Sequence, residues 1–447
     1  MTAARKPADM GDTFEPYGLG WRAVLCQRTV RFTVRRLRHD GGSLKGYVDV
    51  EFKAPNAPRV RLAGEVLNLS SGRDRASFAN RIAERQPGPD WRNLVDQFCV
   101  EVERRDDEGE EVVLIGNLPA PINGGWLIDG LLERGQNNGI HGDGSVGKSW
   151  LALACAVSVT AGVEILPGYR PTQRGAALYL DYETDKDTLN MRVQQIARGA
   201  GIAPPDILYL RMDSPLSDSV ERILSICQQH GVVLIVVDSV EAAMAGSVSP
   251  GASSNEGPSK VNRALRRLGG ITSLLIDHVS AEQGRQTEVA RKAFGSIFKR
   301  NWVRLAFHLQ QSREPSDDGM RHLGLFCAKR NNGKEFDPVG LAWEINDEVC
   351  QWRREEISSD DLQDSLPPID RVVAYLRREG PSQPSAIVEG TGLKRTTVTS
   401  MLTRKQGKLF VRTVTGLWDA APTPAAEPEY ADVDDQLPWP DAGDADA

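Results

Sequence analysis

The sequence has few of the residues that build metal clusters, disulfide frameworks or membrane spans. Its 447 residues include six histidines and six cysteines, and no two cysteines form a Cys-x-x-Cys pair. We therefore expect no structural zinc site, and reduced thiols in a cytoplasmic protein. No apolar run approaches the roughly 18 to 20 residues of a transmembrane helix, and the amino-terminal segment lacks the apolar stretch of a signal peptide. No membrane association is expected.

Negative charge is concentrated at the carboxyl end. The formal net charge is −7, but residues 421–447 contain eight carboxylates and no basic residue. The rest of the chain therefore has a net charge of +1, and the acidic total does not argue against nucleic-acid binding. Three interpretations of this tail stay open: docking on a partner, competition for a basic DNA surface, or solubilising disorder.

Changes of pattern divide the chain into five segments. Residues 1–18 are predicted to be loose, and residues 19–118 to form a small α+β accessory module of antiparallel strands followed by two helices. Residues 119–358 are predicted to form an α/β core. Residues 366–420 show three short helices and a hairpin, which is the order of a winged helix-turn-helix. Residues 421–447 are predicted to form an acidic, disordered tail.

Short apolar strands alternate with helical stretches in the core. This alternation predicts a mostly parallel sheet covered by helices, with a more hairpin-like end after Arg321. The predicted strands span residues 176–180, 207–210, 232–237, 273–276, 303–309, 323–328 and 339–343.

A G-x-x-x-x-G-K-S pattern follows a strand-like segment and precedes a helix-forming one. Glycines let backbone N–H groups surround a phosphate, and the helix that follows directs its positive end at the anion. Lys148 is expected to neutralise charge on the β- and γ-phosphates, and Ser149 to hold Mg²⁺ through its hydroxyl. The predicted ATP-binding residues are Gly142, Asp143, Gly144, Ser145, Val146, Gly147, Lys148 and Ser149.

Polar residues follow three other apolar strands. Asp238 directly follows the apolar run 232–237 and is the candidate Walker-B acid, which would bind Mg²⁺. The alternative role of Asp238 is a helix N-cap. In RecA-like cores a Glu at the end of a neighbouring strand aligns the attacking water. In most other P-loop folds this Glu directly follows the Walker-B Asp, but here Ser239 follows Asp238. Glu183 is therefore assigned the catalytic role by elimination. The alternative is that Glu183 is a solvated loop acid. His278 is either a phosphate sensor or a structural histidine.

The order of these motifs resembles the RecA-like hexameric ATPases of phages and plasmids, notably RepA-type replicative helicases. The resemblance covers roughly residues 121–350 and rests on segments 126–132, 142–149, 178–183, 238–239 and 276–278. It implies a homo-hexameric ring that binds ATP between subunits and moves along single-stranded DNA held in its pore.

Rings of this kind need a basic residue supplied across the subunit interface. Residues 326–333 resemble the hairpin that carries it in replicative helicases, and make Lys329 or Arg330 the candidate. The spacing differs from the Lys-x-Arg-Asn-Gly pattern common there, so the choice between the two stays open. The fallback candidates are Lys299, Arg300 and Arg304. The alternative is that Lys329 and Arg330 are a solvated Lys-Arg pair at a turn, without a role in hydrolysis.

Basic residues in two regions are candidates for contacts with DNA. Segments 243–260 and 280–292 fit pore loops, with ordinary surface loops as the alternative. Residues 366–420 carry a net charge of +5, which favours duplex DNA over a protein contact. The candidate DNA-binding residues are Arg285, Arg291 and Lys292 in the second loop, and Lys394, Arg395 and Arg404 on the expected recognition helix.

The sequence therefore predicts an ATP- and Mg²⁺-dependent hexameric DNA helicase or translocase of phage or plasmid replication, with the acidic tail available to a replication partner. One alternative is a RecA-like ATPase that acts on DNA in recombination or repair without unwinding it. Another is a nucleotide-switched winged-helix regulator. The accessory module has no assigned role, although five arginines between residues 28 and 38 suggest either a DNA-binding face or a half-solvated strand.

Overall fold

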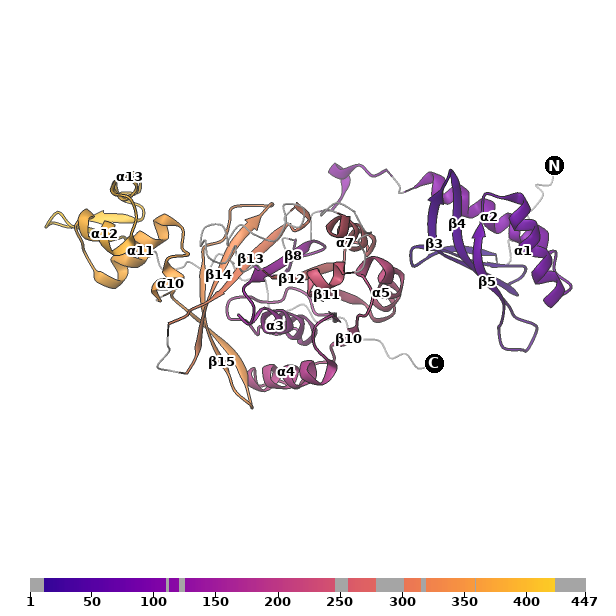
Figure 1. Ribbon diagram of the computed structural model, residues 1–447, viewed down its shortest axis with the longest axis horizontal. Coiled ribbons are helices and arrows are strands. Elements are labelled where there is room, and N and C mark those ends of the chain that lie inside the picture. Colours follow the sequence, from indigo (N-terminus) through magenta and orange to yellow (C-terminus); the bar gives the residue numbers. More distant parts are fainter. Residues whose placement is uncertain are drawn as a thin grey trace, which may run out of the picture. The chain divides into compact units, whose positions relative to one another are not determined.

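The chain divides after Glu356 into two units, Met1–Glu356 and Ile357–Ala447. This boundary lies two residues before the predicted end of the core. The computed structural model (Figure 1) describes residues 12–109, 112–119, 125–245, 256–278, 301–314, 319–357 and 359–422.

An antiparallel sheet and two helices form the accessory module. Its strands are neighbours in chain order, and α1 (Gly72–Arg85) and α2 (Trp91–Glu108) pack on one face because alternate strand residues are apolar. At the centre of this core, the ring of Phe32 stacks on that of Phe98 with centroids 4.9 Å apart. A 3₁₀ turn, Ile115–Asn117, follows. The strands are β1 (Thr13–Tyr17), β2 (Gly20–Leu25), β3 (Val30–Asp40), β4 (Ser43–Phe52) and β5 (Val60–Asn68).

Strand β1 corrects the prediction of a loose segment at residues 13–17, and residues 1–11 lie outside the described residues. It pairs with β2 along its whole length. The ring of Phe14 lies 5.7 Å from Trp21 and 5.8 Å from Phe98, which is on α2. This contact with a residue far away in the sequence orders a segment whose local composition favours a loop.

Nine strands form the central sheet, in the order β10-β9-β11-β12-β8-β13-β14-β15-β16. Pairing is parallel from β10 to β13 and antiparallel from β13 to β16. The predicted α/β fold with a mostly parallel sheet is confirmed. The strands are β8 (Asn137–Gly142), β9 (Ala176–Asp181), β10 (Leu208–Arg211), β11 (Val232–Asp238), β12 (Thr272–His278), β13 (Leu305–Gln311), β14 (Arg321–Arg330), β15 (Val339–Ile345) and β16 (Cys350–Glu355).

Helices cover both faces of this sheet (Figure 1), which explains why its parallel strands are continuous apolar runs. One face packs against α3 (Lys148–Ala161) and α4 (Lys186–Gly199). The other packs against α5 (Leu216–His230), α6 (Val240–Met244) and α7 (Glu256–Arg267). Because β8, β9, β11 and β12 are parallel, their carboxyl ends lie at the same edge of the sheet. None of the described helices is long and apolar enough to cross a bilayer.

Three of the described strands between residues 125 and 356 lie outside the predicted set. The short hairpin of β6 (Trp126–Ile128) and β7 (Leu132–Glu133) precedes the sheet. Edge strand β16 carries Gln351, Arg353 and Arg354 among its six residues, so its sequence lacks the apolar run of a central strand. Pairing with β15, which the sequence does not encode locally, makes it a strand.

The second unit contains helices and one small antiparallel hairpin around its own apolar core. Three helices followed by a hairpin is the expected order for residues 366–420, while the assignment as a winged helix stays a prediction. Helix α10 lies between the predicted core, residues 119–358, and the segment 366–420. The elements are α10 (Asp360–Gln363), α11 (Pro368–Glu379), α12 (Pro384–Thr391), α13 (Arg395–Arg404), β17 (Phe410–Arg412) and β18 (Trp418–Ala420). Tail residues 423–447 lie outside the described residues.

Candidate active site

The connection between β8 and α3 has the backbone of a phosphate-binding loop. A Cβ at Gly142 would lie 2.2 Å from the carbonyl oxygen of Leu309 on β13, so only glycine allows this close approach. Ser145 (φ 65°) and Gly147 (φ 95°) are left-handed. Left-handed turns of this kind direct successive N–H groups toward one anion, which the positive end of α3 also favours.

An aromatic cluster supports the end of this loop. A Cβ at Gly147 would lie 2.7 Å from Cζ3 of Trp343, whose buried ring on β15 therefore packs directly against the loop. The Trp343 ring stacks on that of Trp352, with centroids 6.2 Å apart, and lies 5.9 Å from that of Trp150 on α3. The antiparallel end of the sheet thus fixes the position of the phosphate-binding loop.

Lys148 is buried with its ammonium group inside the loop. The residue is only 4% exposed, and Nζ donates to the carbonyl oxygens of Gly142 at 2.9 Å and Asp143 at 2.6 Å. Nδ1 of His278 lies 3.3 Å from the same Nζ. Burial lowers the pKa of Lys148, and nearby carboxylates, Asp238 foremost, oppose this shift.

Asp238 ends β11 at the same edge. It is 2% exposed, and its Oδ2 accepts a 2.6 Å hydrogen bond from the hydroxyl of Tyr179 on the neighbouring strand β9. Burial raises the pKa of the Asp238 carboxyl, while the hydroxyls of Tyr179 and Ser149 oppose the shift. Oδ1 is buried and accepts no hydrogen bond from the described residues.

These residues fit a magnesium ion that is bound together with a nucleotide. Magnesium is usually held by one or two protein oxygens together with substrate phosphates and water. Ser149 and Asp238 supply a hydroxyl and a carboxylate, and the buried, unpartnered Oδ1 is an oxygen that such an ion or its water would satisfy. Among the described residues, no group of three or more His, Cys, Asp or Glu side chains would hold a metal ion without the nucleotide.

Glu183 lies two residues beyond the end of β9, beside Asp238. Its Oε1 accepts a hydrogen bond from the hydroxyl of Ser239, which directly follows Asp238, and lies 3.5 Å from Nε2 of His278. Because His278 also contacts Lys148, the residues Lys148, His278 and Glu183 form a continuous chain of polar contacts. The structure thus brings together the P-loop, Glu183, Asp238 and His278, as the sequence predicts.

Lys329 and Arg330 lie far from this site within the same chain. Arg330 pairs with Leu305, whereas Gly142 of the P-loop packs against Leu309, four residues or about 13 Å further along β13. Nζ of Lys329 donates to the carbonyl oxygen of Val303 at 2.6 Å. The Arg330 guanidinium lies 4.2 Å from the ring centroid of Phe336. Neither cation reaches the P-loop of its own chain.

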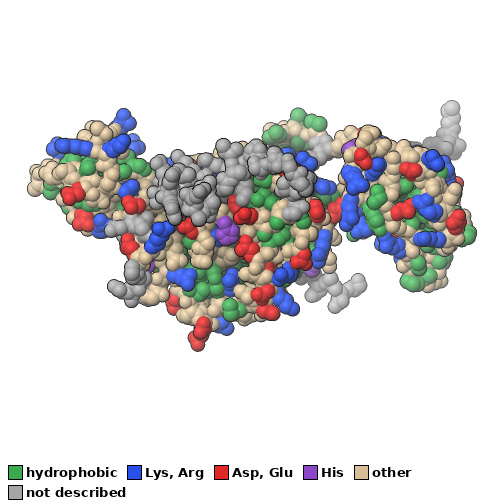
Figure 2. Space-filling view, viewed as in Figure 1, with side chains coloured by type: hydrophobic (Ala, Val, Ile, Leu, Met, Phe, Trp, Pro, Cys, Tyr) green, Lys and Arg blue, Asp and Glu red, His purple; other side chains and the backbone are tan. Residues whose placement is uncertain are grey.

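The candidate DNA-binding residues are described only in part. Lys394 precedes α13, and Arg395 and Arg404 are its first and last residues; all three are exposed. Figure 2 shows Lys and Arg side chains gathered over the part of the second unit that contains α13. Arg285, Arg291, Lys292 and most of segment 243–260 lie outside the described residues, as do Lys299 and Arg300.

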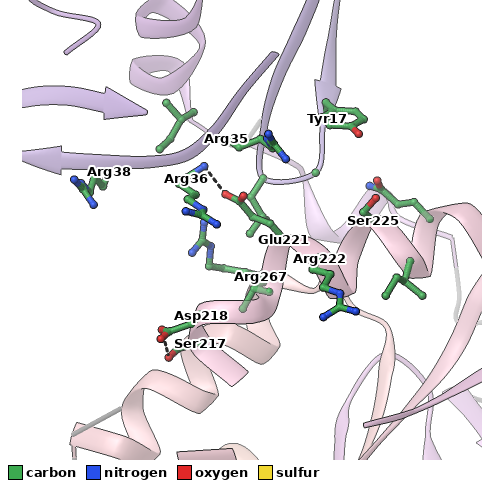
Figure 3. A pocket seen from close by; sticks show the side chains of 16 residues that line it. Tyr17, Arg35, Arg36, Arg38, Ser217, Asp218, Glu221, Arg222, Ser225 and Arg267 are labelled. Carbon is green, nitrogen blue, oxygen red and sulfur yellow. Dashed lines mark hydrogen bonds between the residues drawn. The ribbon is translucent and has the colours of Figure 1, made fainter. Parts of the chain in front are cut away.

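The arginines of the accessory module are partly neutralised. Figure 3 shows Arg35, Arg36 and Arg38 extending from β3. Arg35 forms an ion pair with Asp49, and Arg31 one with Glu51 at 3.1 Å. Exposed pairs of this kind add little stability. They also reduce the positive charge that the sequence suggested as a DNA-binding face.

Sequence reasoning missed two site residues, Tyr179 and Ser239. Tyr179 interrupts an apolar strand, and a buried tyrosine hydroxyl needs a hydrogen-bond partner, so the signal was present. Ser239 was used only to exclude a glutamate after Asp238, although its hydroxyl holds Glu183.

A phosphate-binding loop, a buried acid at the end of a second parallel strand and a carboxylate beyond a third define a RecA-like P-loop ATPase core. In agreement, residues 106–284 match the model of a family described as an AAA domain. No curated protein matches the chain. A solved structure of a KaiC-like protein from the hyperthermophilic archaeon Pyrococcus horikoshii OT3 is 14% identical, covers 51% of this chain and 93% of its own, and has a TM-score of 0.35.

Replacing Gly147 tests the packing of the loop. Gly147→Ala should weaken ATP binding at least about tenfold, because the left-handed backbone costs a non-glycine residue about 1–2 kcal/mol and the new Cβ collides with Trp343. Gly201→Ala is the matched control, since Gly201 is also left-handed (φ 67°) but has nothing within 4 Å of a Cβ. Titration with a fluorescent ATP analogue measures both, and equal affinities for the two variants would contradict the assigned contact.

Proposed function

We propose that this protein is an ATP- and Mg²⁺-dependent DNA helicase or translocase that serves replication of a phage or plasmid. The observation that carries the ATPase part is the convergence of Lys148, Asp238 and Glu183 at one edge of the sheet. The motif order that resembles RepA-type helicases and the net charge of +5 on residues 366–420 support the action on DNA.

Hydrolysis would proceed by attack of water on the γ-phosphorus, with cleavage of the bond to the bridging oxygen of ADP. Lys148 and the amino-terminal end of α3 neutralise charge on the phosphates. Ser149 and Asp238 would hold Mg²⁺, which supplies further neutralisation of phosphate charge when bound. Glu183 orients the water and accepts its proton, a contribution of typically 10²–10⁴-fold. Ser239 keeps the carboxylate of Glu183 beside this position.

His278 is suited to report the state of the nucleotide. It contacts the P-loop cation through Nδ1 and lies near the catalytic carboxylate through Nε2. A phosphate that draws Lys148 away from the carbonyl oxygens of Gly142 and Asp143 also removes the cation from His278. We propose that this change is passed to residues 280–292, the expected DNA-contacting loop.

The position of Lys329 and Arg330 favours an action between subunits. Both are too far from the P-loop of their own chain, so either can assist hydrolysis only in a neighbouring copy. A homo-oligomeric ring, a hexamer in the proposed class, provides that neighbour.

Removing the P-loop cation tests the proposed function. Lys148→Ala should reduce ATP hydrolysis by about 10²-fold or more, because it removes the ammonium group that is buried inside the phosphate-binding loop. Strand displacement from forked DNA should be lost together with hydrolysis. Lys186→Ala, which removes an exposed lysine at the start of α4, should leave both activities unchanged. Near-normal hydrolysis by Lys148→Ala would contradict the ATPase site. DNA-stimulated hydrolysis by the wild type with no displaced strand would instead favour a non-unwinding ATPase.

Charge removal on α13 tests the duplex-binding part. Arg395→Ala with Arg404→Ala should weaken binding of the full chain to duplex DNA and reduce the slope of log K against log salt by about 2, if each arginine contacts one phosphate. Removing the same charge from α11, with Arg377→Ala and Arg378→Ala, should leave the slope unchanged. Fluorescence anisotropy over a salt titration measures this slope, and identical slopes for the two double variants would refute the role of α13.

A further inference from the structure

Two tyrosine hydroxyls hold the two acids that end β9 and β11. Tyr179 on β9 donates to Oδ2 of Asp238 at 2.6 Å, and Tyr209 on β10 donates to Oδ2 of Asp181 at 3.1 Å. Both bonds join neighbouring parallel strands at the edge that carries the P-loop. The two pairs have similar chemistry, but they differ in what surrounds each carboxylate.

The second oxygen distinguishes the two acids. Oδ1 of Asp181 accepts hydrogen bonds from the backbone N–H groups of Glu183 and Thr184 and from the Thr184 hydroxyl, at 2.9 to 3.1 Å. Asp181 therefore shapes the turn that leads to Glu183, with both of its oxygens occupied. Oδ1 of Asp238 is buried and has no hydrogen-bond partner among the described residues. Only Asp238 keeps an oxygen available for a ligand.

The Tyr179 hydroxyl limits the rotation of the Asp238 carboxylate. The terminal torsion of aspartate has a broad, two-fold preference, so the side chain alone does not fix which oxygen faces the site. Tyr179 is 1% exposed and its ring is packed in the core beneath α3, so its hydroxyl has a fixed position. A hydrogen bond at 2.6 Å to Oδ2 holds that oxygen and leaves Oδ1 as the oxygen without a hydrogen bond from the described residues.

We infer that Tyr179 is a positioning residue that orients Asp238 for the magnesium ion of a bound Mg²⁺–nucleotide. The inference rests on the proposed function and adds a residue that acts on the ion only through Asp238. Partners of this kind usually contribute 10- to 100-fold to metal affinity.

Nucleotide binding by the full-length chain, with and without Mg²⁺, tests this role. The probe is a fluorescent, non-hydrolysable ATP analogue, titrated in MgCl₂ and again in EDTA. Wild type should bind it more tightly with Mg²⁺. In Tyr179→Phe the ratio of the affinity in MgCl₂ to the affinity in EDTA should be at least about tenfold smaller than in wild type. Its affinity in EDTA should be unchanged, because the P-loop is untouched. Tyr209→Phe, the matched control, should keep the enhancement.

A second variant separates positioning from general damage to the fold. Asp238→Asn should lose the same enhancement, and adding Tyr179→Phe to it should cause no further loss, because Tyr179 acts only through the carboxylate. Electron paramagnetic resonance of Mn²⁺ in the same complexes gives a direct measure of bound metal and should show the same pattern.

The possible failures are distinguishable. An enhancement in Tyr179→Phe within twofold of wild type, or an equal loss in Tyr209→Phe, would overturn the inference alone. A loss of affinity by Tyr179→Phe in EDTA as large as that in MgCl₂ would also overturn it, by showing a purely structural role. A wild-type chain that binds the analogue without regard to Mg²⁺ would overturn the proposed function, and this inference with it.

Discussion

Burial of opposite charges at one edge of a parallel sheet is the constraint on which the site depends. Lys148 and Asp238 are almost fully buried, and a buried charge is tolerated only where hydrogen bonds replace water. The carbonyl oxygens of Gly142 and Asp143 satisfy the ammonium, and the Tyr179 hydroxyl satisfies one oxygen of the carboxylate. The first set belongs to the loop that carries Lys148, and the second exists because β9 and β11 are neighbouring parallel strands that end at the same edge.

The site therefore has a rigid side and an accessible side. The rigid side consists of the phosphate-binding loop, packed against Trp343 and β13, and of Asp238. The accessible side consists of Glu183 and His278, whose side chains are 40% and 36% exposed. This division suits a reaction in which phosphate is held at a fixed position while water reaches the γ-phosphorus from the solvent side.

Local sequence signals predicted most of the core and less of what surrounds it. The P-loop was predictable because the G-x-x-x-x-G-K-S motif adopts a characteristic backbone conformation between a strand and a helix. The apolar strands were predictable because buried parallel strands are continuous apolar runs. Strands β1 and β16 were not, because their order comes from Phe14 packing on α2 and from pairing with β15. Contacts between strands, such as that of Tyr179 with Asp238, depend on the order and register of the paired strands, which the local sequence of each strand does not determine.

The most direct test of the central claim is the fate of ATP bound to Glu183→Gln. This amide keeps the shape of the side chain but cannot accept a proton from water. The account predicts that the variant binds Mg²⁺–ATP like wild type and hydrolyses it at least about 10²-fold more slowly, so that intact ATP is recovered from the complex in a single-turnover experiment. Conversion of the bound ATP to ADP at the wild-type rate would contradict it.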